Sequence, residues 1–389
     1  MTITTLGELR TRGLLDFNDG YRTKKDQLAA SGFRIIRAGD INNGEVSPTG
    51  PDHVAEAYAS AIGQKVLHDN DVVLTTKGTI GRTALVRDAT GHEIYSPQLC
   101  FFRPDSSVLL AKYLYFWLSG PEFTYQSSFM KNSTDMAPYI SLSQLSDTRI
   151  TLPPLPEQQA IAEVLGALDD KIAANRKLVT TINKLASVEY KKSAVTERTL
   201  TDLASFVNGR NFTKNATGDG RVVVRIAELN SGIGGSTVRN QVEDAADDNL
   251  VRPGDILFAW SGSLTVHRWT QPEALINQHI FKVIPNDDVP YWLAYQAVKE
   301  KLPEFKSIAA DKATTMGHIQ RRHLDTAVMV PSPDKISEID PLMSSLWKRA
   351  ITADEESRTL ASLRDTLLPA LMDGTIRVKD AEKQTEEVL

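Results

Sequence analysis

The sequence predicts a mixed α/β (α+β) protein in which two similar globular domains alternate with two long antiparallel helices that form a coiled-coil spacer. Segments about 180 residues apart resemble each other in the same order, and after each copy the short β-rich runs give way to a heptad pattern. A chain of 389 residues can hold two or three domains. The predicted parts are domain 1 at 1–152, the central helix at 153–196, domain 2 at 197–330, and the second helix with a tail at 331–389.

The internal repeat is a series of short matches that never changes order. Arg37–Gly44 resembles Arg225–Gly232, and both copies follow a hydrophobic run that is typical of a strand. The separation drifts from 188 residues at this match to 177 at the last one, as insertions and deletions in loops would produce. The sequence therefore predicts a duplicated unit. The other matches are Gly78 with Gly262, Ser96–Gln98 with Ile276–Gln278, Met136 with Met316, Ile140 with Ile319, and Pro154 with Pro331.

The central helix is predicted from the spacing of its apolar residues, which advance by alternating four and three. Pro156 suits the first helical position, and an end near Lys191 would give a helix of roughly 50 Å at about 1.5 Å per residue. Asn175 is polar, and one polar residue in a seam disfavours slipped registers because only one pairing satisfies its hydrogen bonds. The predicted seam residues are Ile161, Leu165, Leu168, Ile172, Asn175, Val179 and Ile182.

The second helix is predicted over Asp334–Met372, with a less regular apolar stripe. Pro341 and Pro369 are expected to break or bend it near its ends, and Asp373-Gly374 is expected to stop it. Such a stripe is most often the buried face of a surface helix. Because a long helix follows each copy of the repeat, we expect the two helices to bury their stripes against one another.

Composition limits where the chain works and what it binds. A net charge of −5 and a pI near 5.9 argue against coating nucleic acid through bulk positive charge, but local basic faces remain possible. The single cysteine, Cys100, cannot form an internal disulfide, and the first residues lack the apolar run of a secretory signal. No stretch approaches the roughly 20 apolar residues that span a bilayer. The expected setting is the reducing cytoplasm.

Two similar domains held apart by a stiff spacer suit a target with two elements at a fixed separation. Double-stranded DNA offers such a target when half-sites lie about one turn, or 34 to 36 Å, apart. Basic and hydroxyl residues in loops can contact phosphates or base edges, although short Lys/Arg clusters are more often solvated surface and glycine-flanked loops can be plain hairpin turns. The candidate DNA contacts are Arg22, Lys24, Lys25, Lys77, Thr79, Arg82, Arg210, Ser261, Ser263, Arg268, Arg321 and Arg322.

Signals for catalysis are weak, so no catalytic or metal-binding residue is predicted. Thr76–Arg82 lacks the spacing of a phosphate-binding loop, and the histidines show no metal-ligand spacing. The nearest imitation of a metal-dependent nuclease site is Asp287 and Asp288 with Glu304 and Lys306. A self-sufficient nuclease is therefore the alternative to a DNA-binding subunit, and a protein-binding helical adaptor is a third possibility.

Two long segments resemble a known family. Leu152–Arg176, which begins LPPLPEQQAIAEVL, is similar to the central spacer of the specificity (S) subunits of Type I restriction-modification enzymes, and Leu363–Arg377 is similar to their C-terminal spacer. The repeated Arg37–Gly44 element also resembles their target-recognition domains. The second copy departs from the pattern, since Val330–Glu338 reads VPSPDKISE where the first copy has PPLPEQQ. This departure puts in doubt whether partner subunits would dock on identical surfaces of the two copies.

The resemblance implies two α/β target-recognition domains, each reading one half of a split DNA sequence, and a pair of helices that fixes the gap. It implies no active site and no cofactor on this chain. Two modification subunits would bind the spacer, supply S-adenosylmethionine and methylate adenine-N6, and restriction subunits would cleave DNA with ATP and Mg²⁺. Because recognition loops vary between members, the resemblance assigns no base-contacting residue, and the candidates above rest on chemistry alone.

Overall fold

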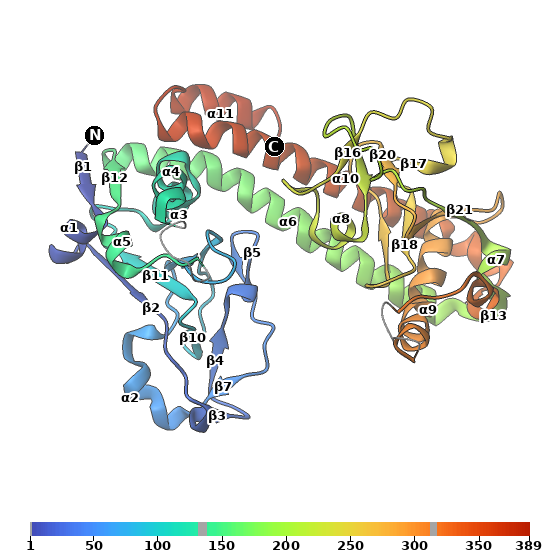
Figure 1. The fold of residues 1–389 in the computed structure, drawn as a ribbon, viewed down its shortest axis with the longest axis horizontal. Helices are drawn as coiled ribbons and strands as arrows, with labels where there is room; N and C mark the ends of the chain where they lie inside the picture. Colours follow the sequence, from blue (N-terminus) through green and yellow to red (C-terminus); the bar gives the residue numbers. More distant parts are fainter. Residues whose placement is uncertain (1, 131–137, 312–316) are drawn as a thin grey trace. The chain divides into compact units, whose positions relative to one another are not determined.

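A computed structural model describes residues 2–130, 138–311 and 317–389 (Figure 1). The chain forms two compact units, one of Met1–Lys171 with Leu360–Leu389 (unit 1) and one of Ile172–Thr359 (unit 2). Each unit therefore combines one globular domain with stretches of both long helices. The predicted match of Met136 with Met316 lies outside the described residues. Within the described parts of the chain, no helix is long and apolar enough to cross a membrane.

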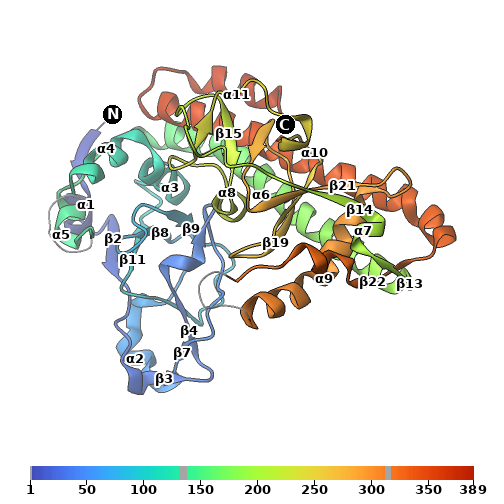
Figure 2. The ribbon, with the colours of Figure 1, turned by 45° about the vertical axis from the view of Figure 1, so that its right-hand side comes forward.

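Unit 1 is built on two four-stranded sheets. One has the order β2-β11-β8-β9 and is antiparallel, and Figure 2 shows these four strands side by side. The other has the order β10-β4-β7-β3 and contains the parallel pair β10 and β4. The bounds are β2 Leu15–Asp19, β3 Leu28–Ala29, β4 Phe33–Ile36, β7 His53–Val54, β8 Val72–Thr75, β9 Thr83–Leu85, β10 Glu93–Tyr95 and β11 Leu99–Pro104; β1 Thr2–Thr5 pairs separately with β12 Arg149–Leu152, and β5 Ile41–Asn42 with β6 Glu45–Val46.

The core of unit 1 lies between its two sheets, where Ile36, Val73, Tyr95 and Phe101 form one buried cluster. All four residues of β8 are buried, because the second sheet covers one face of the strand and a helix packs on it from the other. The helices of unit 1 are α1 Leu6–Thr11, α2 Ala59–Ile62, α3 Ala111–Ser119, α4 Pro121–Met130, α5 Leu142–Asp147 and α11 Val378–Glu386. Helix α3 is the one that packs on β8. The C-terminal helix α11 was not predicted as a separate element.

Unit 2 repeats this design. Its antiparallel sheet has the order β14-β21-β18-β19, and its second sheet, β16-β15-β20-β17, again contains a parallel pair, β15 with β20. The bounds are β14 Ala204–Asn208, β15 Arg221–Val224, β16 Arg239–Asn240, β17 Leu250–Val251, β18 Ile256–Ala259, β19 Thr265–Arg268, β20 Ala274–Ile276 and β21 Ile280–Pro285; β13 Ala194–Thr199 pairs with β22 Ala327–Pro331, and the helices are α7 Leu200–Leu203, α8 Ile226–Ser231 and α9 Tyr291–Asp311.

The shared topology confirms the predicted duplication and corrects one match. The amide of Ser96 donates to Ile36 O at 2.9 Å, and the amide of Asn277 donates to Val224 O at 3.0 Å. These equivalent bonds align Ser96 with Asn277, so the predicted match of Ser96–Gln98 with Ile276–Gln278 is wrong by one residue. The sequence alone misleads here because both copies contain a glutamine, whereas the backbone bonds define which residues occupy the same place.

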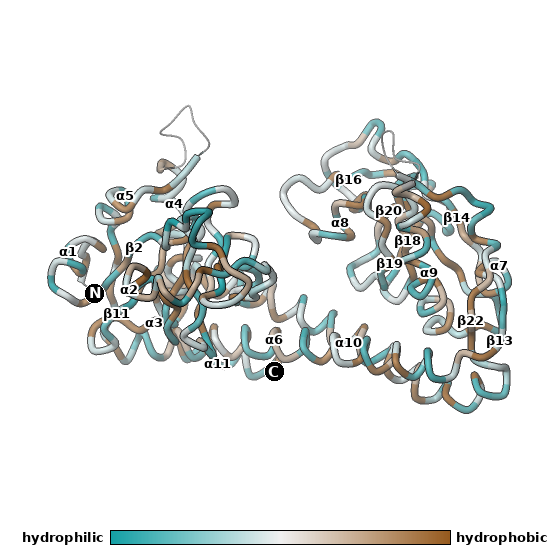
Figure 3. The backbone as a smooth tube through the Cα atoms, turned by 90° about the horizontal axis from the view of Figure 1, so that it is seen from below, coloured by the Kyte–Doolittle hydropathy of each residue, from teal (hydrophilic) through white to brown (hydrophobic). Residues whose placement is uncertain are grey.

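The two long helices are α6, Leu155–Ser193, and α10, Pro333–Met372, and they pack together as predicted. In unit 2, Asn175 Nδ2 donates to Glu356 Oε2 at 2.9 Å, and further along α6 Tyr190 shares a buried cluster with Met343, so the helices run antiparallel. In unit 1, Arg364 Nη1 of α10 lies 2.7 Å from Asp169 Oδ1 of α6. Six of the seven predicted seam residues are buried and Val179 is half-buried; Figure 3 shows hydrophobic and hydrophilic stretches alternating along both helices.

The helix ends differ from expectation in two details. Helix α6 begins at Leu155, so Pro156 is its second residue. Helix α10 continues through Pro341 and Pro369, although both were expected to break or bend it near its ends. A proline removes one backbone hydrogen bond, and buried neighbours on the same helix, such as Met343 and Leu367, hold these turns in place. The predicted stop is confirmed, because α10 ends at Met372 and Gly374 has a positive φ of 76°.

Candidate nucleic-acid interface

Strand register brings three loops of unit 1 to one edge of its antiparallel sheet. Strand β2 ends at Asp19, which pairs with Cys100, and β8 ends at Thr75, which pairs with Leu99. The loops 20–25 and 76–82 and the turn 96–98 therefore meet at the start of β11. In unit 2, Asn208 pairs with Phe281 and Ala259 with Ile280, which gathers loops 209–214 and 260–264 and the turn 277–279. We call each set of three segments the contact edge of its unit.

A glycine allows the chain to enter each contact edge. The amide of Gly20 donates to Leu99 O at 3.1 Å, and a Cβ on Gly20 would lie 2.2 Å from the carbonyl oxygens of Tyr95 and Ser96. A Cβ on Gly209 would lie 2.3 Å from Asn277 O. No larger residue fits at either place. The sequence analysis missed these glycines, although a glycine that follows Asp or Asn at the end of a strand in both repeats was a usable signal.

In unit 1 the candidate residues lie on the contact edge with most of their side chains exposed. Arg22, Lys24 and Lys25 are exposed in the first loop. In the second loop Lys77 is half-buried and Thr79 is exposed. Arg82 at the end of this loop is exposed and donates to Asn42 Oδ1 at 2.9 Å. This edge therefore presents basic and hydroxyl groups to solvent, as contact with phosphates requires.

In unit 2, Arg210 and Ser263 are exposed on the contact edge. Arg321 and Arg322 are exposed in the short helix 321–325, and Arg321 Nη2 donates to Phe206 O at 3.3 Å. Ser261 is different, because only 5% of it is exposed and its Oγ lies 3.1 Å from His279 Nδ1. Its hydroxyl thus supports the turn 277–279, and this buried position argues against its prediction as a DNA contact.

The loops around Gly78 and Gly262 occupy equivalent places in the two units. Lys77 forms an antiparallel bridge with Tyr139, and Ser261 forms one with His318. Gly78 and Gly262 both have positive φ, 78° and 63°. The two loops therefore share one backbone design while carrying different side chains, an arrangement that would let two domains of one fold contact different sequences.

Arg268 is not on the contact edge, and its burial argues against its prediction as a DNA contact. Only 6% of its side chain is exposed. The guanidinium lies 4.8 Å from the ring centre of Trp347 on α10, and Nη2 is 3.8 Å from Asp354 Oδ2 on the same helix. Burial lowers the pKa of Arg268 and raises the pKa of Asp354. The sequence pattern could not separate a solvent-facing arginine from one that docks a domain on a helix.

The residues of the alternative nuclease site do not converge. Asp287 and Asp288 are exposed beyond the end of β21, whereas the contact edge lies at its start. Glu304 of α9 is hydrogen-bonded to Lys301 of the same helix. Across residues 2–130, 138–311 and 317–389, no group of three or more His, Cys, Asp or Glu side chains could hold a metal ion. The residues that resemble a nuclease site in the sequence are therefore not brought together in the described part of the fold.

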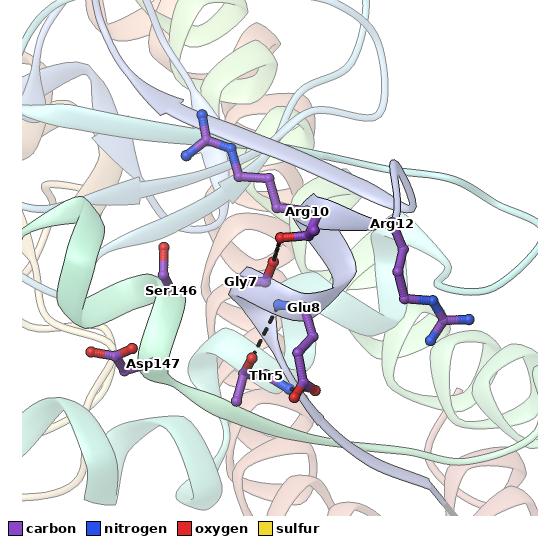
Figure 4. Close-up of a pocket in the computed structure, with 8 residues that line it drawn as sticks. Thr5, Gly7, Glu8, Arg10, Arg12, Ser146 and Asp147 are labelled. Atoms are coloured by element: carbon purple, nitrogen blue, oxygen red, sulfur yellow. Dashed lines mark hydrogen bonds between the residues drawn. The ribbon is translucent and has the colours of Figure 1, made fainter.

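An open hollow of about 530 Å³ in unit 1 lies away from the contact edge, between α1 and α5 (Figure 4). Thr5 and Glu8 line it, and the Glu8 amide donates to Thr5 Oγ1 at 3.1 Å as part of a helix cap. Hydrogen bonds from the Thr4 hydroxyl and the Thr5 amide lower the pKa of Glu8. Thr199 and Asp202 form the same cap at the start of α7. The shared cap is a further sign of the duplication and holds the first helix of each domain.

Comparison with known proteins finds similarity to one family. Residues 6–184 match the family model for the Type I restriction modification DNA specificity domain. The chain is 28% identical over 145 residues to the Type I restriction enzyme EcoBI specificity subunit of Escherichia coli, covering 36% of this chain and 30% of that protein. It is 25% identical over 180 residues to the MjaVIII specificity subunit of Methanocaldococcus jannaschii, covering 45% and 42%. The matched region, residues 6–184, is therefore similar to the specificity subunits of Type I restriction enzymes.

A solved structure extends the similarity in fold to almost the whole chain. The S subunit of the Type I restriction-modification system from M. genitalium superposes with a TM-score of 0.56 at 18% sequence identity, covering 95% of each chain. This agreement supports the arrangement of two α/β domains and two long helices. The chain spans less than half the length of the curated specificity subunits it matches, 30% of one and 42% of the other.

Proposed function

We propose that this chain is a specificity subunit, a non-catalytic DNA-binding subunit of a Type I restriction-modification complex. Each domain would read one half of a bipartite sequence in double-stranded DNA, and α6 with α10 would set the gap between the halves. The observation that carries the proposal is the duplicated contact edge, since each unit presents exposed basic and hydroxyl side chains on loops with one backbone design.

The proposal assigns chemistry to partner chains. Two modification subunits would dock on the helical spacer, hold S-adenosylmethionine and methylate adenine-N6 in the bound sequence. Restriction subunits would join that core and use ATP and Mg²⁺ to translocate and cleave DNA. This chain itself would bind no cofactor and would work in the cytoplasm. This separation of roles is supported by the positions of Asp287, Asp288 and Glu304, which do not form a metal-binding group among the described residues.

The test is DNA binding by the full chain together with its modification subunit over a series of salt concentrations. Neutralising several phosphates releases counterions, so affinity should fall steeply as salt rises. A protein-binding adaptor would show no salt-dependent DNA affinity, and that result would reject the proposal.

A nuclease control completes the test. The full chain is incubated with DNA and Mg²⁺ without partners, and Glu304→Ala is compared with the unmodified chain. The proposal predicts no cleavage by either protein. Cleavage by the unmodified chain that Glu304→Ala abolishes would instead support the self-sufficient nuclease.

A further inference from the structure

Four buried side-chain nitrogen or oxygen atoms within the described residues have no hydrogen-bond partner: Thr23 Oγ1, Ser96 Oγ, Arg268 Nε and Gln278 Oε1. Arg268 lies against Trp347 of α10, away from the contact edges. The other three all lie on the contact edges, Thr23 and Ser96 in unit 1 and Gln278 in unit 2. Because buried polar groups are almost always paired in folded proteins, this concentration points to a partner that the isolated chain lacks.

Gln278 lies in the middle of the unit 2 contact edge. On one side of it, Asn277 forms a bridge with Arg210. On the other side, His279 O accepts a hydrogen bond from the Trp260 amide at 3.2 Å. These backbone bonds fix the turn that carries Gln278, so its side chain is presented from a defined position next to exposed Arg210.

Gln278 also lines an open hollow of about 360 Å³ whose chemistry suits a base edge better than a phosphate. Ile226 and Val238 contribute an apolar wall. Arg225 lines the hollow too, but its guanidinium is paired with Glu228 at 2.6 Å and donates to Ser236 O at 3.0 Å. The guanidinium charge is thus paired, and among the described residues that line the hollow Gln278 is the one with a buried side-chain oxygen that has no hydrogen-bond partner.

We propose that Gln278 reads an adenine in the half-site bound by unit 2. A glutamine amide can accept from adenine N6 and donate to adenine N7 at once, and rotation of its last torsions turns the amide into the hollow it lines. The adenine amino group would supply the missing donor to Oε1. This inference rests on the proposed function and names one specificity-determining residue within it.

The same position in unit 1 cannot make this contact. The alignment of Ser96 with Asn277 places Pro97 where unit 2 has Gln278, and proline has no side-chain donor or acceptor. The unpaired hydroxyls of unit 1, those of Thr23 and Ser96, lie at other positions of its contact edge. The two domains therefore read different bases through one backbone design, and the halves of the target should differ at this position.

The test compares Gln278→Ala with Gln271→Ala, a control in the loop that precedes β20, whereas Gln278 follows it. Each full chain is expressed with its modification subunit, and methylation-sensitive sequencing of the cellular DNA gives the motif. Gln278→Ala should relax one adenine position in one half-site, with discrimination there falling roughly 5- to 150-fold, the range expected for loss of a bidentate contact. Gln271→Ala should leave the motif unchanged.

A second variant keeps the test decisive if Gln278→Ala fails to fold. Gln278→Glu retains the size of the side chain but only accepts hydrogen bonds, so preference at that position should move from adenine towards cytosine, whose N4 donates. An unchanged motif in a folded Gln278 variant, or equal loss of both half-sites, would overturn the inference while leaving the proposed function standing. If the unmodified chain yields no split motif, both the inference on Gln278 and the proposed function are rejected.

Discussion

The variant Arg268→Ala distinguishes between two roles of Arg268, docking of domain 2 on α10 and contact with DNA. In unit 2 the guanidinium lies 4.8 Å from the centre of the Trp347 ring, which also packs edge-on against Tyr295 at 5.3 Å. Nη2 of Arg268 lies 3.8 Å from Asp354 Oδ2. Truncation removes both contacts at the surface where domain 2 meets α10. We therefore expect the variant to lose stability and to keep the charge of its contact edge.

The size of the effect follows from burial. A desolvated cation–π contact contributes about 2 kcal/mol. The ion pair adds up to about 1 kcal/mol, because the side chain of Asp354 is 32% exposed and the pair is long. A loss of roughly 3 kcal/mol lowers the Tm of a unit of this size by about 6 to 12 °C.

The pH dependence has a definite sign. Burial raises the pKa of Asp354, and the charge of Arg268 opposes that rise. Without Arg268, the pKa of Asp354 in the folded protein should rise further above its value in the unfolded chain. The Asp354 carboxylate of the folded variant therefore binds a proton more readily than that of the unfolded chain. Its stability then increases as pH falls through the folded pKa. The loss of stability of Arg268→Ala relative to the unmodified protein should therefore become smaller at acid pH.

The assay is thermal unfolding across a pH series, with DNA affinity measured at a temperature where both proteins are folded. Arg322→Ala is the control, because Arg322 is exposed and its loss should leave the Tm of unit 2 unchanged. A Tm for Arg268→Ala within about 1 °C of the unmodified protein, together with weakened DNA binding, would refute the docking role and restore Arg268 as a contact.

Three further predictions concern the contact edges and the spacer. Lys77→Ala or Arg322→Ala should weaken DNA binding by about 1 to 3 kcal/mol if it removes a base contact, and unchanged affinity in both would reject the loop assignment. One heptad inserted within Ile161–Ala186, matched by one in α10, should widen the gap of the recognised sequence and leave both half-sites intact; altered half-sites would contradict the spacer model. Gly209→Ala should lower the Tm of unit 2, because its Cβ would lie 2.3 Å from Asn277 O, and an unchanged Tm would argue against this close approach.

The duplication and the helices could be predicted because their signals are local and periodic. A heptad stripe specifies which residues meet a partner helix, and Ile161, Leu165 and Leu168 are all buried. The four-part division at 1–152, 153–196, 197–330 and 331–389 remains a prediction.

The contact residues were harder to predict, because exposure depends on distant parts of the chain. Arg268 and Arg322 look alike in sequence, yet the first meets Trp347 and the second faces solvent. Gln278 gave no motif of its own, since its unpaired oxygen becomes visible only when the fold has paired its neighbours. Helix α10 likewise passes through Pro341 because tertiary packing outweighs the local cost of proline.

The most direct test of the central claim is methylation-sensitive long-read sequencing of DNA from cells that express the chain with its neighbouring modification subunit, compared with cells that lack only the chain. A DNA-reading specificity subunit predicts a split, adenine-methylated motif that appears only when the chain is present. A methylation pattern that is the same with and without the chain would contradict the claim that this protein selects the sequence.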